Sequence, residues 1–295
     1  MQPDKTIDTT QSQTGPTLYV GLALGLSLAT LAPKAGADPM EVTSDVSATP
    51  CSQRLQPVFA PDLDDVEGEI DDIIEQRFGS HRDWGLENLS LVEDPQAGAV
   101  LRAFFPAGTS SPSDGKRGGA GFYAAPQALA GAEHACLRYR LHFPDGFDFV
   151  KGGKLPGLYG GEAPSGGTQA TGDNGFSARF MWRRDGQGEL YAYVVNQDTA
   201  YGASLGRGSW HFASGDWVTV EQEIRLNDPD RQDGLMRVWI DGEPRLEVSG
   251  VEFRDVQDAH IDGLMFSTFF GGTGESWRTP RDQYLDFADF KFYRR

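Results

Sequence analysis

The chain has 295 residues, and its 43 acidic and 26 basic side chains give a formal charge of −17. With 39% hydrophobic residues it has enough apolar material for a core, which excludes extended disorder. Nucleic acids and anionic membranes are bound through broad basic surfaces, so the charge argues against both as partners. Any polyanionic ligand must be met by a local basic patch.

The first segment with a clear signature is the uncharged apolar run Leu18–Ala32. It is shorter than the roughly 20 residues that a membrane-spanning helix needs. The small residues at 35–37 (AGA) form a site of the type that signal peptidase cleaves. We therefore expect residues 1–37 to be a signal peptide, the protein to be secreted or periplasmic, and no membrane contact after cleavage. An uncleaved anchor or a disordered leader is the alternative, because Lys5 is the one cation before the run.

Residues 38–50 are rich in Ser, Thr and Pro and are predicted to be a polar linker, followed by one domain over residues 51–295. The chain has two cysteines, Cys51 and Cys136. In an exported protein an even pair most simply forms a disulfide, which would tie the start of the domain to a central strand. Two free thiols are the alternative. The wide spacing fits no zinc motif, and we expect no metal site.

Short strand-like runs recur through the domain between turns rich in Gly, Pro and Asp. In Ala135–Phe143 apolar residues stand at every second position. Trp217–Leu226 behaves alike, with Glu221 and Glu223 on the face away from its apolar residues. This alternation is typical of half-buried strands, with one face on the core and one in solvent.

A hairpin is predicted further along the chain, where the run 235–240 leads through Asp-Gly at 241–242 into the run 245–248. Only Val66–Phe78 has a good helical pattern, and it is short. Many strands separated by turns, without alternating helices, predict an all-β fold: an antiparallel β-sandwich or β-jelly roll.

Side chains suited to chemistry concentrate in residues 151–195. If 176–183 is a strand, alternation places one set of side chains on a common face, namely Ser177, Arg179, Met181 and Arg183. A following strand over 189–195 would add Tyr191 and Tyr193 to that face.

A five-residue turn over 184–188 would place Arg179 opposite Tyr193, so that a hydroxyl, a guanidinium and two phenols converge on one surface. Residues 150–184 carry five basic and two acidic side chains, a local charge of +3 against the acidic whole. An ordinary solvated hairpin face is the alternative interpretation of this cluster.

Several motifs then occur in a characteristic order: GGKLPGL at 152–158, FSxRxMWR at 176–183, ELYxY at 189–193, YG at 201–202, GxWxxVEQ at 215–222, TFFGG at 268–272 and DFADFKFY at 286–293. Together they resemble polysaccharide lyase family 14, which comprises alginate and glucuronan lyases on a β-jelly roll. The resemblance covers residues 152–293, and no family motif is matched before Lys151.

The resemblance implies a polysaccharide lyase that cleaves an anionic uronate polysaccharide by β-elimination. It implies that Lys154, Tyr191 and Tyr193 are catalytic and that Ser177 and Arg179 bind substrate. In this hypothesis Arg179 binds the carboxylate. Lys154 and one tyrosine, with Tyr193 favoured, exchange protons, while Tyr191 and Ser177 position the sugar. No cofactor is implied, and we expect a monomer. Mannuronate, guluronate and glucuronate substrates are left open.

Two other functions compete with this one. A jelly-roll glycoside hydrolase needs two carboxylates, for which the acidic segment 69–75 is the best candidate. A non-catalytic carbohydrate-binding module would need exposed aromatic rings, for which Trp210, Trp277 and Tyr201 are candidates. The five histidines show no metal spacing and are interpreted as structural, with His142 or His211 near the cleft.

Overall fold

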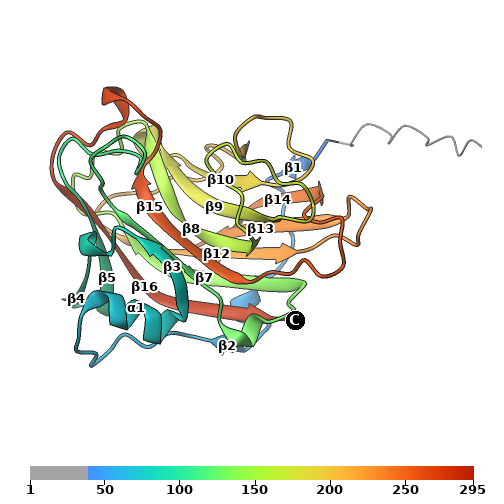
Figure 1. Ribbon diagram of the computed structural model, residues 1–295, viewed down its shortest axis with the longest axis horizontal. Coiled ribbons are helices and arrows are strands. Elements are labelled where there is room, and N and C mark those ends of the chain that lie inside the picture. Colours follow the sequence, from blue (N-terminus) through green and yellow to red (C-terminus); the bar gives the residue numbers. More distant parts are fainter. Residues whose placement is uncertain (1–38) are drawn as a thin grey trace, which may run out of the picture. The chain divides into compact units, whose positions relative to one another are not determined.

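The computed structural model describes residues 39–295, which fold into two antiparallel sheets packed face to face (Figure 1). In the larger sheet the order is β1 (Glu41–Thr43), β14 (Glu243–Val251), β13 (Gly234–Ile240), β12 (Trp217–Arg225), β7 (His134–His142), β16 (Gln283–Arg294), β5 (Gly98–Phe105) and β4 (Leu89–Asp94), with β2 (Pro57–Phe59) paired to β16. In the smaller sheet it is β11 (Ala203–Leu205), β10 (Gly188–Tyr193), β9 (Gly175–Arg183), β8 (Gly152–Gly161), β15 (Gly263–Phe270), β6 (Ala120–Ala124) and β3 (Ser80–Trp84). The predicted antiparallel β-sandwich is confirmed.

Helical structure in the described residues is short. One α-helix, α1 (Ile70–Phe78), is accompanied by single 3-10 turns at Cys51–Gln53, Leu86–Asn88, Gln127–Leu129, Arg184–Gly186 and Glu275–Trp277. The helix begins later than the predicted residue 66, because Asp65 and Gly68 have positive φ angles and Glu69 is extended. It ends at Gly79, whose left-handed conformation lets its N–H bond to the carbonyl of Glu75. Within residues 39–295 no helix has the length and apolarity needed to cross a bilayer.

The core lies between the two sheets and is rich in aromatic rings. On β9 the side chains of Phe176, Ala178, Phe180 and Trp182 are buried in this core, as alternation requires. Trp182 packs edge-on against Phe143 of the segment after β7 and Phe270 of β15, with ring centroids 5.8 and 5.3 Å apart. Because one face of β9 is fixed in the core, its other side chains must lie on the outer face of the smaller sheet.

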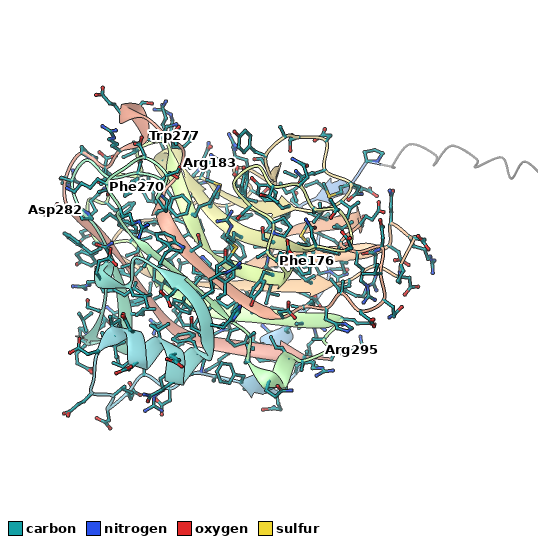
Figure 2. The ribbon with its side chains drawn as sticks, viewed as in Figure 1. Phe176, Arg183, Phe270, Trp277, Asp282 and Arg295 are labelled. Carbon is teal, nitrogen blue, oxygen red and sulfur yellow. A yellow bond between two sulfur atoms is a disulfide. The ribbon has the colours of Figure 1, made fainter. Side chains whose placement is uncertain are left out.

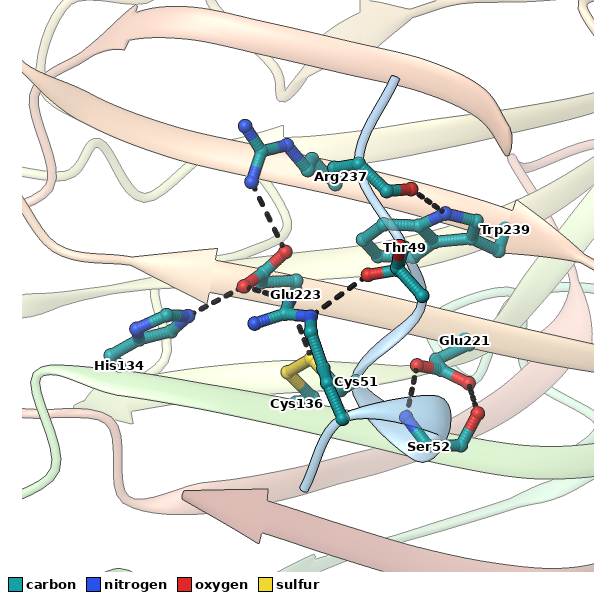
Figure 3. Close-up of a disulfide and its surroundings, with 11 residues drawn as sticks. Thr49, Cys51, Ser52, His134, Cys136, Glu221, Glu223, Arg237 and Trp239 are labelled. Carbon is teal, nitrogen blue, oxygen red and sulfur yellow. Dashed lines mark hydrogen bonds and ion pairs between the residues drawn. A yellow bond between two sulfur atoms is a disulfide. The ribbon is translucent and has the colours of Figure 1, made fainter. Parts of the chain in front are cut away.

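The segment predicted to be a polar linker packs on the larger sheet instead. Residues 41–43 form β1, paired with β14, and Val46 is buried. The indole N–H of Trp239 donates to the carbonyl of Ala48. The disulfide between Cys51 and Cys136 then joins this segment to β7, a central strand, as predicted (Figure 3). The predicted signal peptide, residues 1–37, lies outside the described residues.

This N-terminal segment also changes the environment of β12. Glu221 and Glu223, predicted to face solvent, are buried beneath it, so the prediction of a half-buried strand is wrong for these two positions. Ser52 donates to Glu221 through both N–H and Oγ (Figure 3). Arg54 pairs with Glu223 at 2.5 Å. Burial alone would raise the pKa of Glu223, but hydrogen bonds from His134 and Arg54 outweigh it and lower that pKa to about 2.

Candidate active site

A cleft of about 820 Å³ lies on the outer face of the smaller sheet. Its floor is formed by side chains of β3, β6, β8, β9, β10 and β15, and its walls by loops that follow β5, β8, β10 and β15. The residues that line it are Trp84, Ser111, Pro112, Ser113, Arg117, Tyr123, Lys154, Ser165, Gly166, Arg179, Met181, Arg183, Tyr191, Tyr193, Tyr201, Met265, Ser267, Phe269, Gly272, Thr273 and Trp277, of which Figure 2 labels Arg183 and Trp277.

The charge of the cleft is opposite to that of the chain. Four of its lining residues are basic, namely Arg117, Lys154, Arg179 and Arg183. No Asp or Glu lines it in the part of the chain that the structure describes. A cationic cleft in an acidic protein concentrates anionic ligands locally and repels them elsewhere. The local basic patch expected from the sequence is therefore present.

The β9–β10 hairpin brings the predicted residues together, but in a register that differs from the prediction by two residues. Tyr191 lies opposite Arg179, and Tyr193 lies opposite Ser177. The turn has three residues, 184–186, rather than five, and is closed by a hydrogen bond from the N–H of Arg183 to the carbonyl of Gln187. Positive φ angles at its last two residues allow this tight turn. A shift of two keeps every side chain on its predicted face, so the convergence holds.

Lys154 reaches the floor of the cleft from β8, where it pairs with Met181 on one side and Phe269 on the other. Its side chain is 9% exposed, and its Nζ atom lies 2.7 Å from the Met181 sulfur. Burial, followed by the charges of Arg179 and Arg183, holds the pKa of Lys154 well below its usual range. This lysine is therefore able to lose its proton at a much lower pH than a lysine in water.

Arg179 is a buried cation that has no carboxylate partner within residues 39–295. It is 4% exposed, its Nη1 donates to Ser267 Oγ at 3.1 Å, and its buried Nε has no hydrogen-bond partner. Burial lowers its pKa from the usual value. A buried charge without a counter-ion is costly, and a bound anion would relieve that cost.

The two tyrosines form a pair beside Arg179 and Lys154. Their rings meet edge to face with centroids 5.8 Å apart, and the Tyr193 hydroxyl accepts a hydrogen bond from the N–H of Gly167 at 3.1 Å. Burial, and then the charge of Tyr193 and a hydrogen bond with it, raise the pKa of Tyr191 to about 12. The phenol of Tyr191 is therefore held in its neutral form.

Ser177 lies beneath the cleft wall and does not line the cleft. Its side chain is fully buried, and its Oγ donates to the carbonyl of Pro164 at 2.6 Å. Pro164 belongs to the loop 162–174, which contributes Ser165 and Gly166 to the cleft. The structure therefore gives Ser177 the task of holding this loop in place.

Other candidates from the sequence separate clearly. Tyr201 and Trp277 line the cleft, whereas Trp210 is buried at 4% exposure and presents no ring to a ligand. His142 and His211 are not among the lining residues. The acidic side chains of α1 line a different, smaller cavity.

Sequence reasoning missed Trp84, Arg117, Tyr123 and Phe269, which reach the cleft from β3, the β5–β6 loop, β6 and β15. Three of them lie in the part of the chain where no motif was matched. The signal available for Arg117 is the basic pair at 116–117 between glycines, in an otherwise acidic chain. For Trp84 the signal is indirect: Gly121 leaves room for its indole, since a Cβ there would lie 2.2 Å from Trp84 Nε1.

Comparison with known proteins was consistent with this geometry. Residues 93–290 match the family Polysaccharide lyase 14. The PL-14 alginate lyase from Aplysia kurodai is 32% identical over 81% of this chain and 100% of its own, with a TM-score of 0.71. Two further structures share the fold. A mutant of alginate lyase Aly36B in complex with alginate tetrasaccharide is 20% identical over 80% of this chain and 96% of its own, with a TM-score of 0.67. The endo-β-1,4-glucuronan lyase from the fungus Trichoderma reesei is 13% identical over 81% of this chain and 96% of its own, with a TM-score of 0.52. No curated protein sequence matches.

Proposed function

We propose that this chain, which belongs to polysaccharide lyase family 14 and is a polysaccharide lyase, cleaves an acidic uronate polysaccharide, alginate or glucuronan, by β-elimination. The observation that carries the substrate class is Arg179, a buried guanidinium that has no carboxylate partner in the described residues and opens on a cleft without acidic side chains. Each sugar of a polyuronate brings one carboxylate, which a guanidinium binds through two parallel hydrogen bonds. The alginate bound to the Aly36B mutant supports a ligand of this class.

The carboxylate contact also serves the chemistry. Elimination removes the proton at C5, the carbon that bears the carboxylate, and negative charge develops on the carboxylate oxygens as it leaves. A buried cation already in place stabilises that charge without having to reorganise. Arg179 therefore binds the substrate and lowers the barrier to proton removal through the same contact.

Lys154 is the proposed base. Its lowered pKa makes the neutral amine available at a lower pH than in a solvent-exposed lysine, and a neutral amine has the free electron pair that the C5 proton needs. As that proton moves to Nζ, the C5–H electron pair forms the C4=C5 double bond and the C4–O4 bond breaks. The departing O4 then requires a proton.

Tyr193 is the proposed proton donor. Its oxygen accepts a hydrogen bond from the Gly167 N–H, which leaves its own proton free to move to O4. A proton passed back from Lys154 through solvent restores both groups. No water is consumed, and the products are one unsaturated uronate end and one new reducing end.

The hydrolase alternative finds no support in the cleft, because inverting and retaining glycosidases both need two carboxyl groups across the scissile bond. A pure binding module would have no use for a deprotonatable lysine beside two phenols. We also propose export through residues 1–37, which the Cys51–Cys136 bond supports, since disulfides persist in oxidising compartments. Action as a monomer is a separate proposal. N-terminal sequencing of the exported protein and its mass in solution test both.

The test of the function is ultraviolet absorbance of the conjugated uronate on polymannuronate, polyguluronate and glucuronan in parallel, beside an assay of reducing ends. Absorbance and reducing ends are expected to rise together on at least one polymer, and both are expected to vanish in Lys154→Met. Reducing ends without absorbance would identify a hydrolase. Binding of the polymer without either signal would identify a binding module.

A further inference from the structure

Glu189 is a fully buried carboxylate at the start of β10, to which the proposed mechanism gives no role. It carries an ion pair with Arg183 on β9, and its Oε2 accepts from Ser204 Oγ and from Arg207 Nε, both at 2.6 Å. Burial alone would raise its pKa, but the hydrogen bond and charge of Arg183 outweigh it, so the carboxyl is ionised in the folded protein. A buried anion inside a cationic site calls for an explanation.

The position of Glu189 links it to the reacting groups. It pairs across the strands with Met181, whose sulfur lies 2.7 Å from Lys154 Nζ. Two residues further along β10 on the same face is Tyr191, and the Arg183 guanidinium lies 5.9 Å from the centre of that ring. Arg183 is 14% exposed and lines the cleft, so its charge is held by Glu189 at the edge of the site.

We propose that Glu189 is a positioning residue that binds and neutralises Arg183, so that, of the two guanidinium groups that β9 contributes to the described cleft, Arg179 alone is left for the substrate carboxylate and Lys154 faces one uncompensated cation from that strand instead of two. This inference rests on the proposed function. It predicts that the net positive charge at the point of cleavage matches one substrate carboxylate. An unpaired Arg183 would offer a second, wrongly placed cation.

The charges around Lys154 support this balance. From β9 it is faced by Arg179 and Arg183, which both lower its pKa, and from β10 by Glu189, which raises it. The other titratable groups of the cleft are Tyr191 and Tyr193 on β10, Tyr123 on β6, Tyr201 in the loop after β10 and Arg117 in the β5–β6 loop, while Met265, Ser267 and Phe269 of β15 carry no charge. Among the described groups whose charge shifts the pKa of Lys154, Glu189 is therefore the acidic one.

Lys154 can be titrated directly, without substrate. The chain has six lysines, so ¹³Cε-lysine labelling of the full-length protein gives few signals, and Lys154→Met identifies the one from Lys154. Glu189→Gln is expected to lower the Lys154 midpoint by about one pH unit, because Arg183 is then uncompensated. The double variant Glu189→Gln/Arg183→Met, which removes both charges, is expected to return the midpoint towards that of the wild type.

The matched control is Arg207→Gln. Arg207 contacts the same carboxylate but is 49% exposed and lies outside the cleft, so its loss is expected to leave the Lys154 midpoint unchanged. If Glu189 has a purely structural role, all three variants should change the Lys154 titration alike, or the midpoint of the double variant should be no closer to that of the wild type than the midpoint of Glu189→Gln. An unmoved midpoint in Glu189→Gln, or a shift that Arg183→Met does not reverse, overturns the proposal.

Kinetics on the polymer supply the second readout. In Glu189→Gln the acid limb of the kcat/KM profile is expected to move with the Lys154 midpoint, while kcat falls about tenfold. The double variant is expected to recover the position of the limb. Because the titration needs no turnover, a wild-type protein without lyase activity refutes the proposed function, whereas an active protein whose limb ignores Glu189 refutes the positioning role alone.

Discussion

The Nζ atom of Lys154 lies 3.5 Å from the centre of the Tyr191 ring, with both side chains on the outer face of the smaller sheet. An ammonium over an aromatic ring is ordinarily favourable. Here the same nitrogen is buried close to Arg179 and Arg183, and burial and repulsion dominate, so its pKa is lowered rather than raised. The aromatic ring therefore holds the amine in place without fixing a proton on it, which is the state that a base requires.

Lys154→Met should lower turnover by orders of magnitude and stabilise the fold at pH 7. An unfolded lysine binds its proton up to a pH near 10.4, whereas folded Lys154 releases it at a lower pH. Between the two values the unfolded chain binds more protons, so the contribution of this group to stability rises with pH. Removing the group should raise the free energy of unfolding at pH 7 by about 1 kcal/mol, and the gain should disappear above about pH 10.4.

Urea unfolding of wild type and Lys154→Met at pH 7, 9 and 10.5 measures this effect, and the absorbance assay measures turnover, which should fall by about 10²–10⁴. A variant that is less stable than wild type at pH 7 would show that the lysine is a structural group and not a strained catalytic one.

Arg179→Lys and Arg179→Met should separate charge from geometry. The lysine keeps a cation but loses the planar fork, so kcat/KM should fall about 10- to 100-fold, and further in the methionine variant. On a methyl-esterified polyuronate the carboxylate charge is already absent, so both variants should lose much less. The measurement is kcat/KM on free and esterified polymer, with equal losses on the two substrates arguing that Arg179 acts on folding or access instead.

A structural feature could be predicted from the sequence where neighbouring residues determine it, and less well where contacts between distant residues do. Alternation along β9 and β10 correctly placed Arg179, Tyr191 and Tyr193 on one face, because strand parity is a local property. The predicted register was wrong by two residues, because register depends on the length of the turn. The shorter turn needs a positive φ angle at Asp185, which the residue type does not predict. Because a shift of two residues leaves each side chain on the same face of the sheet, the error did not change which residues meet in the cleft.

Features set by long-range packing were less accessible. Pairing of Cys51 with Cys136 was predicted because an even pair of cysteines in an exported protein most simply forms one disulfide, and it is confirmed. Burial of Glu221 and Glu223 was missed because the segment that covers them is distant in sequence and resembles a linker in composition. Ser177 was placed on the correct face, yet the loop carbonyl of Pro164 occupies its hydroxyl, and no pattern within the strand reveals that contact.

Gly202→Ala should impair catalysis while the fold is kept. A Cβ at Gly202 would lie 2.8 Å from Tyr193 Cε2 and 2.9 Å from Tyr191 Cε1, so both rings must move. Because small displacements of reacting groups are costly, kcat should fall about 10- to 100-fold, with the melting temperature little changed. Gly271→Ala is the matched control, since its Cβ would have its nearest neighbours at 3.5 Å. Equal activity of the two variants would mean that the positions of the rings are not critical.

The acid side of the stability profile should depend on Glu223, on the larger sheet and outside the cleft. Its pKa of about 2 in the folded protein is below the ordinary value of 4.5, so the folded state holds the charged form more strongly than the unfolded state does. The resulting stability, about 3 kcal/mol, is fully present above pH 4.5 and is lost as the pH falls through about 2. Glu223→Gln should therefore lower the free energy of unfolding most at pH 7, and the difference from wild type should narrow between pH 4.5 and 2.

Urea unfolding at pH 7, 4 and 2.5 with the disulfide intact measures that difference, and activity per folded molecule at pH 7 should be unchanged because Glu223 does not line the cleft. The double variant Cys51→Ser/Cys136→Ser is the comparison. Its free energy of unfolding should fall by about 2–5 kcal/mol because a covalent constraint is lost, and this loss should not vary with pH in the same window. A loss in Glu223→Gln that is equally constant with pH would show that Glu223 stabilises the N-terminal segment by packing and hydrogen bonding, and not through its charge on Arg54 and His134.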